Sequence, residues 1–231
     1  MTGVAAIVPA RAGSKGIPGK NVKPLCGKPL LAYTAEVIRE AGIFDRALLS
    51  TDSEEIAALG RTLGLEVPFL RPAELARDDT PMLAVIEHAV AWLKKDGAKI
   101  DIVVLLQPTQ PLRRVTDVVA AVTRLKQEQC DSVVSVVPLP SQLCPDYVMR
   151  IDEEGRLVHF LPEGAKVTRR QDVRPAYIRD GTVYAFRVAT LRNYRSIYGP
   201  DCRPLIIDPK ASVNLDTEED WRGAELKLGS A

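Results

Sequence analysis

Short apolar runs alternate with longer amphipathic segments along most of the chain. The run at 102–106 consists of five consecutive aliphatic residues, which is typical of a strand covered on both faces in a parallel sheet. The pattern predicts strands at Val4–Val8, Arg46–Ser50, Val67–Leu70, Ile102–Leu106, Ser132–Val137, Val183–Arg187 and Leu205–Ile207. Strand and helix follow each other in turn, so the sequence indicates βαβ units with right-handed crossovers.

The amphipathic segments predict helices, and polar residues mark where several of them begin. Asp52 is expected to cap the second helix, because Glu55 follows three residues later as in a capping box. The last helix is expected to start at Asp216 or Thr217, since three acidic residues fill its first turn. The expected helices are Leu30–Ala41, a segment from Asp52 to about Leu63, Met82–Lys95, Val115–Lys126 and Thr217–Leu228.

Residues 138–180 break this rhythm. They are rich in proline and charge and carry only two weak strand patterns, Tyr147–Ile151 and Arg156–Phe160. The sequence Asp-Glu-Glu-Gly at 152–155 lies between them and predicts a hairpin turn. We therefore expect this segment to leave the main sheet.

Composition excludes several classes of function. The 231 residues suffice for one large domain or two small ones, at about 100–200 residues per domain. Lys plus Arg number 31 against 30 Asp plus Glu, and aromatic residues make up 5%, which argues against a nucleic-acid-binding protein. No apolar run is long enough to span a membrane, and the stretch Met1–Pro9 lacks the basic region of a signal peptide.

Cysteine and histidine offer little chemistry. The four cysteines form no CxxC pair, and the two histidines, His88 and His159, lie in apolar-rich segments. A zinc site and a histidine-based catalytic triad are therefore not expected. Four reduced thiols are consistent with a cytoplasmic protein.

The most informative segment is a loop rich in glycine and cations that follows the first predicted strand. It reads Pro9-Ala10-Arg11-Ala12-Gly13-Ser14-Lys15-Gly16-Ile17-Pro18-Gly19-Lys20-Asn21. Ligands of α/β sheets bind at the carboxyl ends of strands, where glycines let backbone N–H groups approach a phosphate and cations neutralise its charge. The loop lacks the Gly-Lys-Ser/Thr of a P-loop and the glycine spacing of a dinucleotide fingerprint. It indicates a phosphate site, with a solvated basic loop as the alternative.

This loop resembles the nucleotide-binding signature of the acylneuraminate cytidylyltransferases, which make CMP-sialic acid. Three further blocks of the family match in order, at Phe69–Ala76, Leu105–Arg113 and Val213–Trp221. Shorter segments at Thr168–Asp172 and Arg179–Tyr184 are also similar. The resemblance therefore covers nearly the whole chain.

The resemblance implies an α/β, three-layer Rossmann-like nucleotidyltransferase fold with a mainly parallel sheet. It implies one nucleotidyltransferase domain over residues 1–231. Within that domain, residues 139–180 would form a small extended dimerisation arm that reaches over the active site of a partner in a homodimer.

The reaction implied by the resemblance joins CTP to a nonulosonic, sialic-acid-like sugar acid and releases pyrophosphate. The anomeric hydroxyl attacks the α-phosphorus in line, so positioning and charge neutralisation should dominate catalysis. The catalytic residues implied are Arg11, Lys15, Lys20 and Asp216. The residues implied in nucleotide binding are Ala10, Arg11, Gly13, Ser14, Lys15, Lys20, Asn21 and Arg71.

For the sugar acid, the resemblance implies contacts from Gln107, Arg170, Asp180 and Tyr184. Arg170 is one of four cations in the arm and is expected to meet the substrate carboxylate across the dimer. A solvated charged face is the alternative. Asp216 is expected to bind Mg²⁺ together with substrate phosphates, or else only to cap the last helix.

Two departures from the family leave the acceptor and the metal count open. Asn214 stands where some members have a second acid, and Gln110 stands where the third block usually has serine. The acceptor could be sialic acid or a relative such as legionaminic or pseudaminic acid. Two other functions stay open: transfer to a sugar phosphate from another nucleotide such as GTP, and a non-catalytic nucleotide-binding domain. The combination of phosphate-binding cations with a metal carboxylate argues against the latter.

Overall fold

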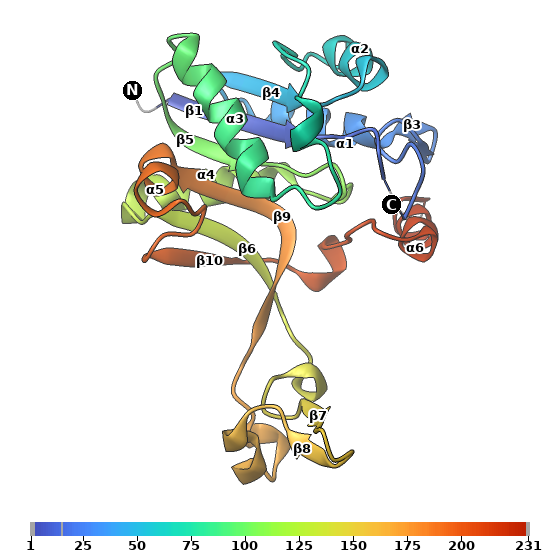
Figure 1. Ribbon diagram of the computed structural model, residues 1–231, viewed down its shortest axis with the longest axis vertical. Helices are drawn as coiled ribbons and strands as arrows, with labels where there is room; N and C mark the ends of the chain where they lie inside the picture. Colours follow the sequence, from blue (N-terminus) through green and yellow to red (C-terminus); the bar gives the residue numbers. More distant parts are fainter. Residues whose placement is uncertain (1–2, 15, 230–231) are drawn as a thin grey trace.

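The computed structural model describes residues 3–14 and 16–229. A six-stranded sheet forms its centre (Figure 1). In sheet order the strands are β10 (Cys202–Ile206), β6 (Ser132–Pro138), β9 (Tyr177–Arg187), β5 (Ile100–Leu105), β1 (Gly3–Pro9) and β4 (Arg46–Ser50). The pairs β1–β4, β1–β5 and β6–β10 are parallel, and β9 runs antiparallel between β5 and β6. The expected mainly parallel sheet is confirmed.

Helices cover both faces of the sheet and give the three expected layers. On one face α1 (Leu30–Ala41), α2 (Glu54–Thr62) and α4 (Val115–Glu128) supply apolar residues to one core cluster. On the other face α3 (Met82–Lys95) and α5 (Val188–Tyr194) pack on β5 and β9. No helix in the described part of the chain is both long and apolar enough to cross a membrane.

Smaller elements complete the chain. The helix α6 (Glu218–Gly229) lies outside the sheet, beside the loop that follows β1 and the two-residue strands β2 (Pro24–Leu25) and β3 (Lys28–Pro29) (Figure 1). Short 3-10 turns occur at Ala73–Leu75, Ser141–Leu143, Pro162–Lys166, Arg170–Asp172 and Pro209–Ala211.

Several sequence-based boundaries are corrected by the structure. The strand expected at Val67–Leu70 does not form, because Pro68 has no N–H to donate and only Glu66 makes an isolated bridge, to Leu48. The strand expected at 183–187 is longer and begins at Tyr177, and the one expected at 205–207 is Cys202–Ile206. The expected bounds of α1, α3 and β4 match the observed ones.

The caps differ from expectation in one of two cases. Ser53, not Asp52, caps α2, since its hydroxyl accepts from Ile56 N at 3.3 Å. Asp52 Oδ1 instead accepts from Ala12 N at 2.8 Å and so ties the loop after β1 to the end of β4. The last helix begins with a reciprocal cap, in which Asp220 Oδ2 accepts from Thr217 N at 2.8 Å and Thr217 Oγ1 from Asp220 N at 3.2 Å.

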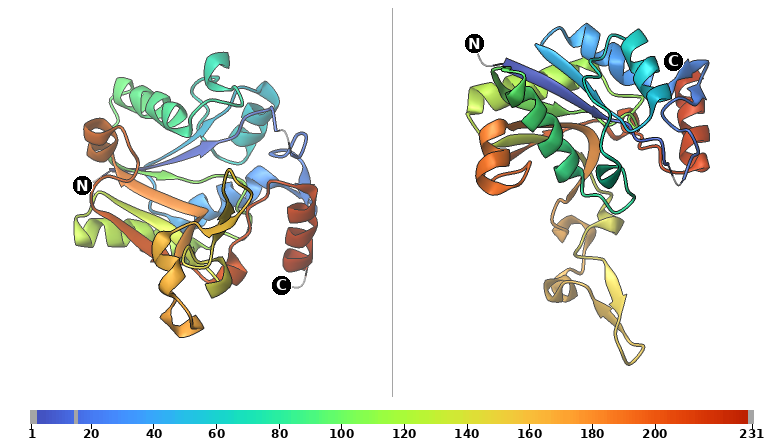
Figure 2. Two further views of the ribbon diagram at one scale, coloured as in Figure 1. Left: turned by 60° about the horizontal axis from the view of Figure 1, so that its bottom comes forward. Right: turned by 45° about the horizontal axis from the view of Figure 1, so that its top comes forward.

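Residues 139–180, called the arm below, follow β6, and most of them leave the sheet and project away from it (Figures 1 and 2). The last four, 177–180, already belong to β9, and Tyr177, Ile178 and Arg179 pair with β6. The expected hairpin is present but shorter, with strands β7 (Met149–Ile151) and β8 (Leu157–His159). The arm is held together inside by the buried carboxylate of Asp146, which accepts from the backbone N of Arg174 at 2.8 Å and from its guanidinium.

Candidate active site

The loop after β1 is fixed by hydrogen bonds at both ends. Ala10 N donates to Ser50 O at 2.9 Å, which keeps the loop's start on the edge of the sheet. Asn21, which is 6% exposed, donates from Nδ2 to Arg11 O at 3.0 Å and closes the loop on itself. These bonds fix both ends of the glycine-rich loop at the carboxyl end of β1, where ligands of α/β sheets bind.

The C-terminal helix α6 packs against this loop. Their shared apolar cluster consists of Ile17, Leu25, Leu30, Leu215, Trp221 and Ala224. Lys23 adds an ion pair to Glu218 at 2.8 Å and lies over the Trp221 ring at 4.6 Å. Gly16 lets the two segments meet, because a Cβ there would lie 1.9 Å from Asp216 O. These contacts join two segments from opposite ends of the sequence and position the loop next to Asp216.

A pocket of about 380 Å³ lies where the loop, the residues after β5 and Asp216 come together. Its position at the carboxyl ends of β1 and β5 is the usual ligand site of such a sheet. The lining residues come from five segments of the chain: Pro9, Arg11, Ser14, Gly16, Lys20, Asn21, Arg71, Met82, Gln107, Pro108, Thr109 and Asp216. Three of them are cations and one is an acid, so the pocket suits an anion.

Lys20 and Asp216 form the charged pair of this pocket. Lys20 Nζ donates to Leu215 O at 2.6 Å and lies 3.4 Å from Asp216 Oδ1. The Lys20 side chain is 12% exposed and that of Asp216 is 64% exposed. The cation is therefore held in the wall, while the carboxylate faces the open pocket. Asn214 Nδ2 donates to the other carboxylate oxygen of Asp216.

The two arginines of the pocket are held differently. Arg11 forms an ion pair with Asp78 at 2.7 Å and is partly exposed. Arg71 is 6% exposed and donates to the hydroxyl of Ser50 at 3.1 Å and to the Ser50 carbonyl. Burial removes water from the Arg71 guanidinium and lowers its pKa to about 10. Arg71 is thus a fixed donor at the pocket wall, and Arg11 lies at its open side.

A buried arginine braces the segment that carries Gln107. Arg113 is 5% exposed and donates to Gln107 O at 2.6 Å, to Thr182 O at 2.6 Å and to Thr34 Oγ1 at 2.9 Å. Burial lowers the pKa of Arg113 to about 9, while nearby Asp180 favours the charged form. These bonds fix the chain after β5 against β9 and α1.

Gly181 of β9 comes close to the side chains of Gln107 and Gln110. Gly181 adopts a φ of +85°, and a Cβ there would lie 3.0 Å from Gln110 Nε2 and 3.6 Å from Gln107 Oε1. Gln110 Nε2 donates to Asp180 O. Asp180 is 8% exposed, and its carboxylate accepts from the backbone N and the hydroxyl of Thr182. Both the carbonyl and the carboxylate of Asp180 therefore accept hydrogen bonds from groups of the same chain.

The structure brings most of the expected site residues to one place. Those that line the pocket are Arg11, Ser14, Lys20, Asn21, Arg71, Gln107 and Asp216. Ala10 lies buried beneath the loop, and a side chain at Gly13 would face open space. Lys15 lies outside the described residues.

Three expected acceptor residues do not line the pocket. Asp180 is buried behind it, and Tyr184 lies within β9, where burial raises the pKa of its phenol. Arg170 lies in the arm, where it donates to Ser141 Oγ at 3.0 Å. Within one chain these residues are therefore separate from the pocket that Arg11, Lys20 and Asp216 line.

Sequence reasoning missed several lining residues. Met82 begins α3, and Thr109 accepts from Leu215 N at 3.0 Å, which joins the residues after β5 to the Asp216 segment. Pro9, Pro108 and Gly16 also line the pocket. Their closeness in sequence to Gln107 and to the loop is the signal that could have identified all but Met82.

The donor set around Asp216 fits one kind of metal ion. No group of three His, Cys, Asp or Glu side chains that could hold a metal occurs among residues 3–14 and 16–229. Magnesium does not need such a group, because it binds through one or two carboxylates together with substrate phosphates and water. The exposed carboxylate of Asp216 beside a cationic pocket meets that requirement.

Comparisons with known proteins agree with this geometry. The sequence profile of the cytidylyltransferase family matches residues 5–201. The CMP-N,N'-diacetyllegionaminic acid synthase of Legionella pneumophila is 32% identical over 94% of this chain and 93% of its own length. The pseudaminic acid cytidylyltransferase of Campylobacter jejuni is 28% identical over 95% of this chain and 94% of its own. The chain spans 51% of the longer N-acylneuraminate cytidylyltransferase of Escherichia coli, at 31% identity.

Solved structures share the fold. A structure of CMP:2-keto-3-deoxy-manno-octonic acid synthetase complexed with CTP superposes with a TM-score of 0.74 and covers 99% of both chains at 16% identity. A cytidylyltransferase from Leptospira borgpetersenii gives a TM-score of 0.66 over the whole of this chain and 88% of its own. These likenesses establish the Rossmann-like arrangement of the sheet and helices.

Proposed function

The chain belongs to the cytidylyltransferase family, and from that premise we propose that it condenses CTP with a nonulosonic acid to give a CMP-sugar and pyrophosphate. Two relatives that match over nearly their full length are named for legionaminic and pseudaminic acid. The carrying observation is the pocket that gathers Arg11, Lys20, Gln107 and Asp216 at the carboxyl ends of β1 and β5.

The reaction is an in-line displacement at the α-phosphorus. The anomeric oxygen of the sugar acid forms a bond to that phosphorus, the bond to the β-phosphate oxygen breaks, and the hydroxyl proton leaves to solvent. Lys20 and Arg11 are the residues that would hold the triphosphate and the departing pyrophosphate. Lys20 is already fixed by Leu215 O, so little rearrangement accompanies the build-up of charge on the leaving group. Lys15 belongs to the same loop and is proposed to act with them.

The rest of the pocket would orient the two substrates. The rigid guanidinium of Arg71 can donate to carbonyl or hydroxyl oxygens of the nucleoside in a fixed geometry. Gln107 is half-buried next to the nucleotide side and offers an amide to the sugar acid. Arg113 acts through Gln107, because it holds the backbone of that residue at 2.6 Å. We place Ala10, Gly13, Ser14 and Asn21 at the nucleotide through their position in or under the loop.

Cytidylyltransferases of this kind generally use a divalent metal ion, and we propose Mg²⁺ for this one. Asp216 would hold it, with the phosphates supplying most other ligands. When bound, the ion supplies Lewis-acid neutralisation of phosphate charge. Residue 214, two positions before Asp216, is an asparagine and not a second acid. A single carboxylate here favours one metal ion over a pair.

The arm supports a homodimer. Its exposed apolar side chains include Leu143, Ile151, Leu157 and Phe160, each at least 58% exposed in the single chain. Covering them against a second copy would remove that apolar surface from water. Arg170 lies in the same arm and would reach the carboxylate of the partner's sugar acid. Asp180 and Tyr184 would then contribute from β9 at the base of the arm. The four free thiols of the chain are consistent with a cytoplasmic location.

The test of the class is pyrophosphate release with Mg²⁺. CTP, GTP, UTP and ATP are each offered with N-acetylneuraminic, legionaminic and pseudaminic acids and with a sugar 1-phosphate. We expect release with CTP and one of the acids. Release only with a sugar phosphate or only with another nucleotide would contradict the proposal.

The role of Arg170 has a matched control in its neighbour. Arg170→Ala should raise the KM for the sugar acid and leave the KM for CTP unchanged. Arg169→Ala removes a cation that is already paired with Asp172 at 2.9 Å, so both constants should change little. Equal increases in both KM values for Arg170→Ala would remove this residue from acceptor recognition.

A further inference from the structure

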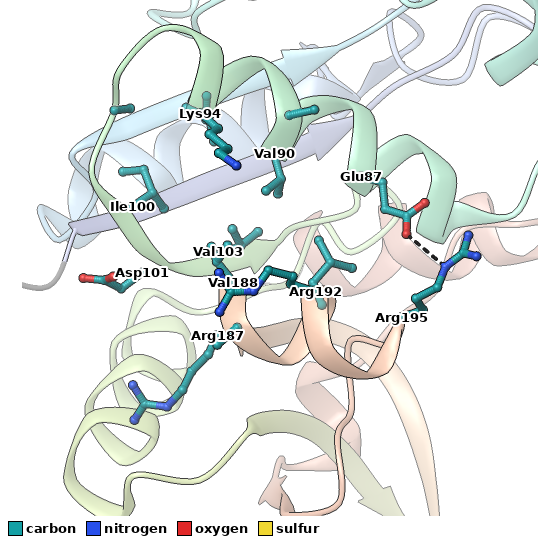
Figure 3. A pocket seen from close by; sticks show the side chains of 15 residues that line it. Glu87, Val90, Lys94, Ile100, Asp101, Val103, Arg187, Val188, Arg192 and Arg195 are labelled. Carbon is teal, nitrogen blue, oxygen red and sulfur yellow. Dashed lines mark ion pairs between the residues drawn. The ribbon is translucent and has the colours of Figure 1, made fainter.

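A second and larger cavity lies at the other end of β5. It has a volume of about 800 Å³ and is bounded by α3, α5 and the first residues of β5 (Figure 3). Ile100 and Asp101 line it at the amino end of β5, whereas Gln107 of the nucleotide pocket follows the carboxyl end of the same strand. Among the residues that the structure describes, the two sites share no lining residue.

Apolar side chains form the walls of this cavity. Val90 from α3, Ile100 from β5 and Val188 from α5 are partly exposed there, above the buried residues Val103 and Leu191. The helix α5, which forms one wall, has only seven residues. Its volume lies in the range of about 300–1,000 Å³ that is usual for small-molecule sites.

The charge around the cavity is one-sided. Four cations line it, Lys94, Arg187, Arg192 and Arg195, against two acids, Glu87 and Asp101. The chain as a whole carries 31 Lys and Arg against 30 Asp and Glu, so this excess is local. Low-dielectric walls with charge of one sign concentrate the field and attract an ion of the opposite sign.

Two of these cations already have partners. Arg195 lies 3.7 Å from Glu87. Arg187 points out of the cavity and donates to the carbonyls of Cys130 and Leu125, both at 2.9 Å (Figure 3). Neither is therefore needed for a ligand.

Lys94 and Arg192 are different. They reach into the space between the helices from opposite walls (Figure 3). Over the described ranges 3–14 and 16–229 no acidic side chain pairs with either, and Arg192 makes only a long contact to Asn193 Oδ1 at 3.5 Å. The carboxylate of Asp101 is directed away from both (Figure 3).

We propose that this cavity binds a small amphipathic anion, a molecule with an apolar body and one carboxylate or phosphate head. The body would lie against Val90, Ile100 and Val188, and the head would lie between Lys94 and Arg192. Arg offers a bidentate fork for such a head, and Lys adds a second donor from the facing wall. Two cations on facing walls of one cavity favour a single head group over an acidic peptide, whose charges would be spread along a surface.

The test uses decanoate as the probe, at concentrations below those that form micelles, with the full chain and isothermal titration calorimetry. Two matched compounds separate the two halves of the proposed site. Decanol keeps the apolar body without the charge, and acetate keeps the charge without the body. We expect decanoate to bind with one site per chain and the other two compounds to show no saturable binding. Decanoate and decyl phosphate compared in parallel distinguish the two possible head groups.

Variants with a matched control locate the site. Lys94→Glu and Arg192→Glu should each weaken decanoate binding at least about tenfold, since each reverses a charge at the head group. Lys95→Glu makes the same change one residue along α3, outside the cavity lining, and should leave binding within about twofold. Ala91→Trp at an exposed lining position of α3 should fill the cavity and block binding while the cytidylyltransferase activity persists.

Each alternative result overturns the proposal. Equal loss in Lys94→Glu and Lys95→Glu would reduce the effect to net charge. Binding of decanol as strong as that of decanoate would leave a purely apolar groove. Competition by CTP would place the probe in the nucleotide pocket instead. Binding of a short peptide of alternating Leu and Glu at these residues, without binding of decanoate, would make the cavity a protein-docking surface.

Discussion

The loop after β1 and the arm are both long, irregular departures from the sheet, yet they bury their apolar residues to very different degrees. In the loop region Ile17 and Leu25 are fully buried, because α6 closes over them. In the arm Ile151 is 73% exposed and Leu157 is 66% exposed. The loop is thus stabilised within one chain, whereas the arm has apolar surface left to bury against something else.

This difference separates two tasks of the proposed enzyme. A phosphate site gains from donors that are in place before the substrate arrives, since ordering them on binding costs free energy. Lys20 and Asn21 meet that condition through bonds to Leu215 O and Arg11 O. In the proposed function, acceptor recognition would instead depend on Arg170 of the arm, which an assembled dimer would bring to the partner's site. Nucleotide binding should therefore survive loss of the dimer, and acceptor binding should not.

Trp221→Ala tests the buried side of the comparison and should have the largest effect. Trp221 is 3% exposed and packs from α6 against the apolar residues of the loop region, so its removal leaves a cavity. We expect a loss of about 3–5 kcal/mol in the free energy of unfolding. The loop also loses its support, so the KM for CTP should rise. Urea unfolding and initial rates measure the two effects.

The matched control for this variant is Leu226→Ala, at a residue of the same helix that is 76% exposed. Its effect should stay within about 0.5 kcal/mol, because surface substitutions rarely change stability more. A Trp221→Ala protein with unchanged stability and unchanged KM would mean that α6 does not support the loop.

Lys20→Ala probes the chemistry of the fixed loop. This residue touches the phosphates in the proposed mechanism, so kcat should fall by about 10²–10³, as for removal of one fixed donor to a developing charge. Lys23→Ala is the control: this cation pairs with Glu218 at 2.8 Å, outside the pocket lining. Its kcat should be nearly unchanged. Equal losses in both variants would point to a general effect of loop charge.

The arm is tested by making its exposed apolar pair polar. Ile151 and Leu157 face each other across the hairpin of β7 and β8. The double change Ile151→Glu with Leu157→Lys keeps a favourable cross-strand pair and removes the apolar surface. We expect the dimer dissociation constant to rise at least about a hundredfold, because about 1.5–3 kcal/mol is lost for each of the two apolar side chains buried at the interface. Sedimentation velocity over a concentration series measures this.

The arm variant also separates the two substrates. Its KM for the sugar acid should rise while its affinity for CTP stays near that of the parent chain. Glu153→Gln in the exposed hairpin turn is the control and should change neither. A parent chain that is monomeric at every concentration would contradict the assignment of the exposed arm residues to a second copy.

The sequence alone predicts the features of this molecule that depend on local signals, and it does not predict those that depend on distant contacts. The bounds of α1 and α3 were predicted correctly, because hydrophobic periodicity and the stop at Gly42 are local signals. The loop after β1 stands out in the sequence as a candidate phosphate site because of its glycines and cations. The strand expected at 67–70 is absent for a local reason as well, because Pro68 within this apolar run has no N–H to donate.

Other features depend on contacts that no local pattern encodes. Lys20 finds its partner Leu215 O 195 residues away, and β9 inserts antiparallel between β5 and β6. The buried bonds of Arg113 to Gln107 and Thr182 link segments that are far apart in sequence. Arg170 lies in the arm, away from the pocket of its own chain, and its proposed role requires a second chain.

The smallest expected effect concerns the cap that starts α6 and so supports the loop. Hydrogen bonds from Thr217, first from its hydroxyl, hold the pKa of Asp220 below its usual value. A depressed folded-state pKa means that the charged cap stabilises the fold at pH values above the unfolded pKa and loses this as pH falls through the folded pKa. Asp220→Asn should therefore cost about 0.5–1 kcal/mol at neutral pH and nothing at the acid end. Glu219→Gln, in the same first turn of α6, is the control, and a cost for Asp220→Asn that is the same at both pH values would assign the effect to geometry instead of charge.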